Sequence, residues 1–134
     1  MKVDGGCHCG SIRYEAEVDP TRVVICHCTD CQTLSGSAFR TVVPTEPNSF
    51  RLRAGTPKVY VKTAQSGTKR RHSFCPNCGT PVNSSADIDE PLTYSLRVGC
   101  LKQRAQLSPK KRNWCRSALA WAQNISTLPA KDTQ

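Results

Sequence analysis

The 134-residue sequence contains no long apolar run, no internal repeat and no low-complexity tract. Because no run of roughly 18 apolar residues is present, we expect no membrane span. The first ten residues, MKVDGGCHCG, lack the apolar segment of a secretory signal, which favours a reducing, cytoplasmic location. Without a linker or a shift in composition, the sequence predicts one domain over 5–125 and a frayed tail over 126–134.

Acidic residues are also scarce. Asp and Glu number 10 against 19 Lys and Arg, which gives a formal net charge of +9. Such a balance indicates either an anionic partner or a solvated basic surface. Two basic runs, 69–71 and 110–112, could meet the acidic groups of a ligand, but solvated charge is the simpler interpretation of each.

Cysteine, in contrast, is abundant, with nine residues. An odd number cannot pair completely into disulfides, and clustered cysteines in a reducing compartment indicate a metal site or catalysis. Two of them, Cys100 and Cys115, stand alone and are most simply buried small apolar side chains. The other seven form a Cys-x-Cys pair, a Cys-x-Cys-x-x-Cys cluster and a Cys-Pro-x-Cys-Gly knuckle, at Cys7 and Cys9, at Cys26, Cys28 and Cys31, and at Cys75 and Cys78.

The knuckle supplies only two metal ligands, so it needs a partner pair. Its turn places both sulfurs on one side, and Gly79 can take the positive φ angle that ends the turn. The isolated pair of Cys7 and Cys9 is the natural partner. Four thiolates would close the coordination shell of a zinc ion, which predicts a structural site.

The three remaining thiols predict a different kind of site, because three protein ligands and one vacant position are the pattern of a catalytic zinc. Two alternatives stay open at this point. One cysteine could bridge two ions, or a fourth protein ligand could close the site, from His8, His27, Asp30 or His72. Since His8 and His27 each stand between two cysteines, chelation of the same ion would be strained, and we expect them beside the metal or exposed.

The local patterns predict a mainly β fold. Alternating or β-branched segments indicate strands at 11–18, 22–25, 38–44, 49–53, 58–63, 68–74 and 92–101. The AGTP segment between the fourth and fifth strands is typical of a hairpin turn. Trp114, Ala118 and Trp121 recur at helical spacing, which predicts a short amphipathic helix over 113–125 that caps the core.

Taken in order, the segments GGCHCGSIRYEAEV, CHCTDCQTLSGSAF, RRHSFCPNCGTPV and RVGCL resemble the glutathione-dependent formaldehyde-activating enzyme family, which includes the centromere protein V domain. The resemblance covers about residues 5 to 122. It implies a β-tent of small antiparallel sheets organised around two zinc ions. It also implies that Ser35 and Gly36, in the small-residue segment after the second site, let a ligand approach the metal closely. Position by position, the structural zinc ligands would be Cys7, Cys9, Cys75 and Cys78, and the catalytic ones Cys26, Cys28 and Cys31.

The resemblance further implies a carbon–sulfur lyase-type activity on an adduct of a thiol and an aldehyde, such as S-hydroxymethylglutathione. The partners would be a small thiol such as glutathione and an aldehyde such as formaldehyde. The thiol could occupy the vacant zinc position as a thiolate, or the aldehyde oxygen could do so instead. Asp30 is the first candidate for a general acid or base, and the alternative for this carboxylate is to cap its loop.

A second class of function is a non-catalytic zinc module that binds nucleic acid or protein. The net positive charge favours this class. The sequence has neither a basic helix nor aromatic residues interleaved with Lys and Arg, as a stacking platform for nucleic acid would need. The enzyme is therefore the favoured interpretation.

Overall fold

The computed structural model describes residues 1–64 and 66–134. The strands are β1 (Lys2–Gly6), β2 (Arg13–Glu17), β3 (Val24–Cys26), β4 (Arg40–Pro44), β5 (Arg51–Ala54), β6 (Lys58–Thr63), β7 (Lys69–Phe74), β8 (Pro81–Ala86), β9 (Ser95–Arg97) and β10 (Lys111–Asn113). The α-helix is α1 (Thr29–Ser35). Short 3-10 turns are η1 (Pro20–Arg22), η2 (Val98–Cys100), η3 (Arg104–Gln106), η4 (Cys115–Ser117), η5 (Ala120–Gln123) and η6 (Ile125–Thr127).

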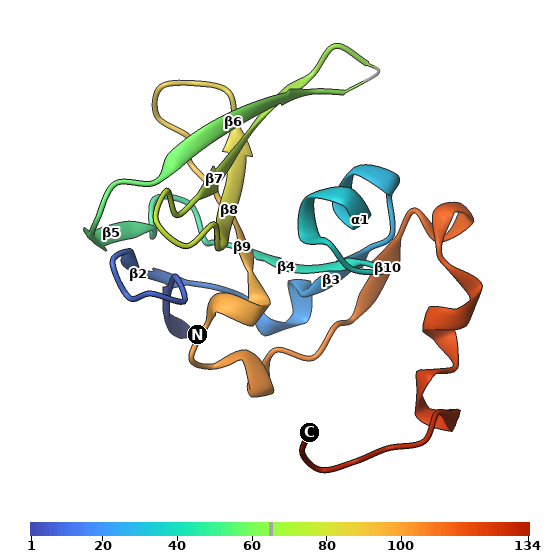
Figure 1. Ribbon diagram of the computed structural model, residues 1–134. Coiled ribbons are helices and arrows are strands. Elements are labelled where there is room, and N and C mark those ends of the chain that lie inside the picture. The colour runs from blue at the N-terminus through green and yellow to red at the C-terminus, as the bar shows by residue number, and fades with distance from the viewer. Residues whose placement is uncertain (65) are drawn as a thin grey trace.

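The strands form two sheets, which confirms the prediction of a mainly β fold with small sheets. The one short α-helix of the described chain lies at Thr29–Ser35 and not at the C-terminus, where the sequence predicted it. The smaller sheet has the order β1-β2-β5, and the larger has the order β10-β3-β4-β9-β8-β7-β6. Only the β10–β3 pair is parallel among these described strands. The larger sheet is bent, so that β6 to β8 stand up from β3 and β4, and α1 lies in the angle between these two parts (Figure 1).

One buried cluster joins the two sheets. Val3 and Tyr14 from the smaller sheet and Val43 and Leu96 from the larger expose 2% or less of their surface. In β1 and β2 the buried residues alternate with exposed ones, as expected for strands with one face on a core. The larger sheet therefore uses one face for the core, and its opposite face is available for a site.

The hairpin predicted around AGTP is wrong. β5 pairs with β2 in the smaller sheet, whereas β6 pairs with β7 in the larger, so this segment carries the chain from one sheet to the other. Gly55 has a φ of +79°, and a Cβ atom there would lie 2.4 Å from the carbonyl oxygen of Ser11. The glycine thus serves a close approach of two backbones at the crossover, which the local sequence could not distinguish from a hairpin turn.

Gly55→Ala is expected to lower the free energy of unfolding by about 3 kcal/mol, because it adds a backbone clash to an unfavourable φ angle. Gly67→Ala is the matched control: Gly67 has a φ of +85°, but a Cβ there would meet no atom of the described residues within 4 Å. The control should cost about 1 kcal/mol. Denaturant unfolding of both variants measures the difference, and equal losses would contradict the close approach.

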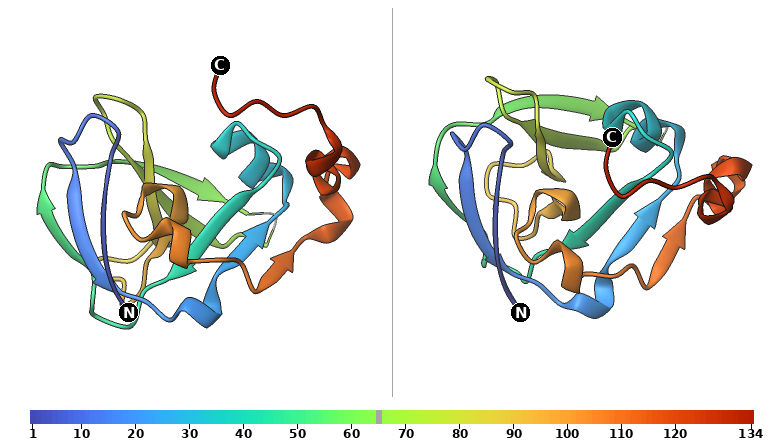
Figure 2. Two further views of the ribbon diagram at one scale, coloured as in Figure 1. Left: turned by 90° about the horizontal axis from the view of Figure 1, so that it is seen from below. Right: turned by 60° about the horizontal axis from the view of Figure 1, so that its bottom comes forward.

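The predicted C-terminal helix over 113–125 does not form. The chain instead makes η4, η5 and η6, and these turns run along the outside of the molecule (Figure 1, Figure 2). Extended backbone at Ala118 and Leu119 separates η4 from η5, and Asn124 separates η5 from η6. Trp114 and Trp121 are exposed at 53% and 64%, so they do not cap the core. A helix of this length without a packed face is marginal in water, which explains why periodicity alone misled the prediction.

Several elements were not predicted from the sequence. They are β1, β8, β10 and α1. β8 consists mostly of small polar residues, yet four of its six residues are buried, so its strand conformation depends on its neighbours β7 and β9. Within the described chain, none of the helices has the length and apolar character needed to cross a membrane.

Candidate functional site

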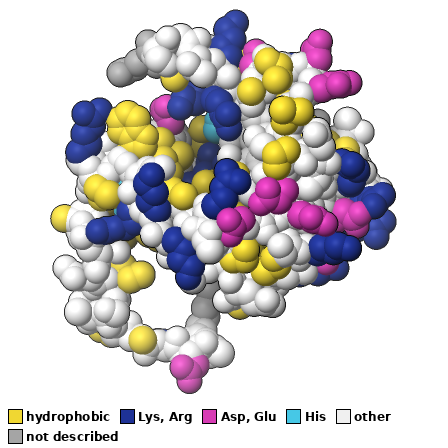
Figure 3. All heavy atoms as spheres, turned by 180° about the vertical axis from the view of Figure 1, so that it is seen from behind, with side chains coloured by type: hydrophobic (Ala, Val, Ile, Leu, Met, Phe, Trp, Pro, Cys, Tyr) yellow, Lys and Arg dark blue, Asp and Glu magenta, His cyan; other side chains and the backbone are white. Residues whose placement is uncertain are grey.

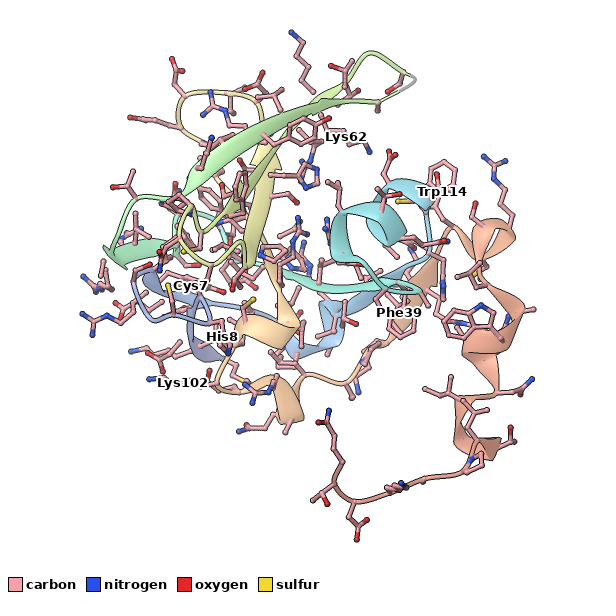
Figure 4. All side chains as sticks on the ribbon, in the orientation of Figure 1. Cys7, His8, Phe39, Lys62, Lys102 and Trp114 are labelled. Carbon is pink, nitrogen blue, oxygen red and sulfur yellow. The ribbon has the colours of Figure 1, made fainter. Side chains whose placement is uncertain are left out.

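The four-cysteine cluster consists of Cys7, Cys9, Cys75 and Cys78, whose sulfur atoms all lie within 4.8 Å of one another. It joins the turn after β1 to the turn between β7 and β8, and Figure 4 labels Cys7 at this point. In the knuckle, the Gly79 N–H donates to the carbonyl oxygen of Cys75 at 2.8 Å. Gly79 has the positive φ, +74°, expected from the sequence.

The spacing of these sulfurs fits a tetrahedral metal ion. The Cys7 and Cys9 sulfurs are 3.5 Å apart, and the Cys9 and Cys75 sulfurs 3.8 Å apart. Zinc–sulfur bonds of about 2.3 Å in a tetrahedron place neighbouring sulfurs about 3.8 Å apart. A disulfide would need a separation of about 2.05 Å, and all nine cysteines are free thiols. The cluster can therefore hold a metal ion with all four positions filled by protein.

Two hydroxyl groups lie beside sulfur atoms of the four-cysteine cluster, and no pattern in the sequence indicated them. The Ser11 hydroxyl lies 3.2 Å from the Cys9 sulfur, and the Thr80 hydroxyl lies 3.1 Å from the Cys78 sulfur. Hydrogen bonds from Ser11, and then from Asn77, lower the pKa of Cys9 to about 7. The bonds from Thr80 lower the pKa of Cys78 to about 7. These donors favour the thiolate form that a metal ion requires.

The three-cysteine cluster consists of Cys26, Cys28 and Cys31, again with all sulfurs within 4.8 Å of one another. Cys26 ends β3, and Cys28 is the N-cap of α1, where its sulfur accepts the Cys31 N–H at 3.2 Å. Burial raises the pKa of Cys28, but hydrogen bonds with Cys31 and Cys26 and the charge of Lys62 together leave the pKa lowered. Burial raises the pKa of Cys31. Of Cys28 and Cys31, Cys28 at the start of the helix is therefore the thiol that ionises more readily.

None of the four alternative fourth ligands, His8, His27, Asp30 and His72, joins the three-cysteine cluster among the described residues. Within the described residues, no histidine or carboxylate joins its sulfurs within 4.8 Å. His8 is exposed beside the four-cysteine cluster, and His27 is buried with its ring against Phe39. Asp30 forms an ion pair with Lys62. The described protein atoms therefore provide three ligands here, in contrast to four at the other cluster.

A cleft of about 620 Å³ opens beside the three-cysteine cluster. Its lining includes Cys26 and Cys31 and is otherwise rich in Lys and Arg; we call it the cationic cleft. Figure 3 shows Lys and Arg side chains gathered around a hollow with a histidine visible inside it. Its basic and histidine side chains are Arg22, Arg40, Lys62, Arg70, His72, Arg97 and Lys111.

The strand register explains why so many cations meet in this cleft. Cys26 is opposite Arg40 in the β3–β4 pair, and Val42 is opposite Arg97 in the β4–β9 pair. Because side chains alternate between the faces of a strand, Arg40, Val42 and Arg97 lie on one face. The same face continues to His72 on β7 and Lys62 on β6. The cationic cleft is thus the face of the larger sheet opposite the core.

The deepest cations of the cleft are held in an unfavourable environment. Arg40 and Arg97 expose only 6% and 7% of their surface. Burial, with Arg40 nearby, lowers the pKa of Arg97 to about 9. Arg97 Nη2 lies 3.1 Å from Nδ1 of His72, and burial together with Arg97 lowers the pKa of His72 to about 4. At neutral pH His72 is therefore uncharged and accepts the guanidinium N–H.

The sequence matches the family described as glutathione-dependent formaldehyde-activating enzyme over residues 2–117. The chain belongs to this family. A crystal structure of a Rhodobacter sphaeroides protein is similar in fold, with a TM-score of 0.62 and 21% sequence identity over 84% of this chain and 100% of that chain. Membership supports a formaldehyde-activating-like role at the level of the family, with glutathione and an aldehyde as the substrates that the family name suggests.

The sequence also singled out two solitary cysteines and the pair of Ser35 and Gly36, and neither cysteine belongs to a cluster. Cys115 is exposed, so its predicted burial is wrong, whereas Cys100 is half-buried and donates to the Pro81 carbonyl oxygen. Gly36 takes a φ of +64° and ends α1, and the Ser35 hydroxyl bonds to backbone carbonyls at the same helix end. Ser35 and Gly36 therefore define where the helix stops.

The two basic runs are divided between the cleft and the solvent. Arg70 and Lys111 line the cationic cleft, whereas Arg71 pairs with Asp87 at 2.7 Å and Arg112 is exposed. Alternation along β7 and β10 separates neighbours onto opposite faces. The simple interpretation of solvated charge therefore misses one residue of each run.

The low pKa of His72 predicts a pH dependence of stability. Since the unfolded side chain has a pKa near 6.5 and the folded one about 4, the unfolded chain binds more protons between these values. Stability should therefore fall as the pH drops from 6.5 to 4, by on the order of 3 kcal/mol at most. Denaturant unfolding across this range measures the loss. His72→Gln, which cannot titrate, should show a shallower slope, and an unchanged slope would contradict the assignment.

Proposed function

We propose that this chain is a zinc-dependent carbon–sulfur lyase-type enzyme that acts on an adduct of a thiol and an aldehyde, such as S-hydroxymethylglutathione. The observation that carries the proposal is the difference between the two clusters. The four-cysteine cluster surrounds its centre with protein ligands, whereas the three-cysteine cluster lies beside a cleft of about 620 Å³. The presence of a cleft does not separate the clusters, since another of about 630 Å³ lies beside Cys7. The ligand count does: a metal ion held by three thiolates keeps one position for a substrate, whereas one held by four keeps none.

The residues of the three-cysteine cluster fit a catalytic zinc ion. Cys26, Cys28 and Cys31 would hold the metal, and the four-cysteine cluster would hold a second, structural ion. A zinc ion bound there supplies positive charge that stabilises a thiolate or an oxygen anion. The Cys31 N–H and the first turn of α1 orient the Cys28 sulfur, which fixes the position of the cluster at the edge of the cleft.

Cationic side chains of the cleft can stabilise the negative charge that forms on the leaving sulfur in this reaction. When the adduct is cleaved, the carbon–sulfur bond breaks, the hydroxyl group loses its proton to give the aldehyde, and the sulfur leaves as a thiolate that takes up a proton. The leaving sulfur thus develops negative charge in a cleft that contains Arg40 and Arg97. Lys62, whose pKa is raised by its hydrogen bond to Asp30, remains charged at the rim.

The arrangement of charge favours an enzyme over a nucleic-acid-binding module. The cations line a hollow of the size of a small-molecule site, and no Phe, Tyr or Trp is among its described lining residues. A surface for single-stranded nucleic acid needs such rings for stacking. Asp30, the candidate acid or base, is held by Lys62 at 2.6 Å, which gives it a role in joining α1 to the β6–β7 hairpin (Figure 4).

Exchange spectroscopy tests the activity directly. With ¹³C-formaldehyde and glutathione at equilibrium, the zinc-loaded protein should accelerate interconversion of free formaldehyde and the S-hydroxymethyl adduct by at least about tenfold over buffer, as expected for a positioned reaction. Cys115→Ser, which alters an exposed thiol away from both clusters, should retain this acceleration. Exchange no faster than in buffer for glutathione and for other small thiols, together with salt-sensitive binding to duplex DNA, would favour the binding module instead.

A further inference from the structure

Two arginine side chains are buried in the cationic cleft without an acid to pair with. Arg40 and Arg97 are each more than nine-tenths buried. The ion pairs within the described residues all involve other cations, namely Arg53 with Glu15, Lys62 with Asp30 and Arg71 with Asp87. Because a buried charge without a partner is strongly unfavourable, such a pair of arginines indicates a ligand that completes it.

The position of the two guanidinium groups points to a ligand in the cleft. Arg40 is opposite Cys26 in the sheet, and Arg97 is on the next strand, on the same face. The Nη2 atom of Arg97 bonds to His72, while its buried Nε atom has no hydrogen-bond partner within residues 1–64 and 66–134. Guanidinium groups present their N–H donors in a fork that matches the oxygens of a carboxylate or a similar oxyanion.

The remaining lining determines which groups of a ligand the cleft can recognise. Arg22, Lys62, Arg70 and Lys111 add four more cations, and no Asp or Glu occurs in the lining among the described residues. The lining therefore has donors for acidic groups and no carboxylate of its own for an ammonium group, and the Asp30 carboxylate beside it is paired with Lys62. Negative charge, not a zwitterionic head, is the property that this surface selects.

A rival explanation is that the arginines only balance the charge of the three-cysteine cluster. Three thiolates and one zinc ion carry a net charge of −1, and Arg97 does lie close enough to Cys31 to feel its charge. One cation would suffice for this balance, whereas two buried arginines and three further cations line the same cleft in addition to Lys62, which Asp30 already pairs. The two explanations predict different behaviour when Arg97 is replaced.

We propose that Arg40 and Arg97 form a subsite for an acidic group of the substrate, so that the thiol partner carries at least one carboxylate or comparable oxyanion and is recognised by its negative charge without a contact to an ammonium group. The identity of the ligand as a thiol rests on the proposed function, but the anion subsite itself does not.

Calorimetry with succinate, a dicarboxylate without a thiol, tests the subsite apart from any activity. Succinate should bind the zinc-loaded protein, with an affinity that falls as salt is added. Arg40→Met and Arg97→Met should each weaken binding on the order of 10- to 100-fold, the effect of losing a charge-assisted hydrogen bond. Arg112→Met is the matched control, because Arg112 lies on β10 but is exposed and outside the cleft. It should change the affinity less than about twofold.

The stability of the same variants separates the subsite from the charge-balance explanation. Without ligand, Arg97→Met should melt at the same temperature as the wild type or higher and retain two zinc ions, because it removes an unpaired buried charge. If the arginines only balance the thiolates, the variant should retain only one zinc ion per chain. Zinc loss with unchanged succinate affinity, or succinate binding that no arginine substitution affects, would overturn the subsite.

A series of thiols then connects the subsite to the reaction. In the exchange assay, mercaptosuccinate should saturate the enzyme at a concentration at least about tenfold lower than the neutral 2-mercaptoethanol, and cysteamine, a cation, should bind weakest. Catalysis with equal affinity for all three would overturn the subsite and leave the proposed function standing. Arginine-dependent succinate binding with no exchange for any thiol would support the subsite and remove the proposed function.

Discussion

Cys75→Ser is expected to abolish the soluble folded protein. Cys75 is completely buried, and its cluster ties the start of the chain at Cys7 and Cys9 to the β7–β8 turn. A structural zinc site in a small domain is worth about 10–16 kcal/mol, which equals or exceeds the total stability of about 5–15 kcal/mol that such a domain has. Loss of one thiolate should therefore leave too little stability for folding at 37 °C.

Soluble yield, circular dichroism and metal analysis measure this effect. The wild-type protein, purified without oxygen and with zinc present, should contain two zinc ions per chain. Cys115→Ser is the control, since the Cys115 thiol is exposed, belongs to neither cluster and donates a hydrogen bond to the Arg112 carbonyl oxygen. A Cys75→Ser protein that melts like the wild type with two zinc ions bound would show that the four-cysteine cluster is not a structural metal site.

Cys28→Ser is expected to leave a folded protein that has lost its activity. The three-cysteine cluster is half-buried at the end of β3 and the start of α1, and it holds no distant segments together. A serine hydroxyl can still cap the helix, because it accepts a backbone N–H as the thiolate does. It cannot replace a thiolate as a zinc ligand, so the acceleration of formaldehyde exchange over buffer, expected to be at least about tenfold, should be lost.

Thermal unfolding and the exchange assay on the same sample test this second prediction. The melting temperature of Cys28→Ser should lie within a few degrees of the wild type, and one zinc ion per chain should remain. Its exchange rate should match that in buffer. If Cys28→Ser and Cys75→Ser lose stability equally, the division into a structural and a catalytic cluster is incorrect.

The cysteine motifs could be grouped from the sequence because their chemistry is local. In CPNCG the turn itself brings Cys75 and Cys78 together, and Gly79 ends it, so spacing was sufficient to recognise the pair. The same reasoning separated four thiols from three, and the structure places the sulfurs in those two groups. β-Branched strands such as β6 were also recognisable, because their residues prefer extended backbone wherever they lie.

Which strands pair, and which distant residues become neighbours, depends in contrast on the tertiary structure alone. The AGTP turn and the helical spacing of Trp114 and Trp121 are local patterns that tertiary contacts override. β5 pairs with β2 and not with β6. The two tryptophans remain exposed, so the C-terminal segment has no packed apolar face. Arg40 and Arg97 are 57 positions apart and carry no motif. They meet beside Cys26 because the registers of β3, β4 and β9 place them on one face, and burial by that face turns two ordinary arginines into a candidate binding site.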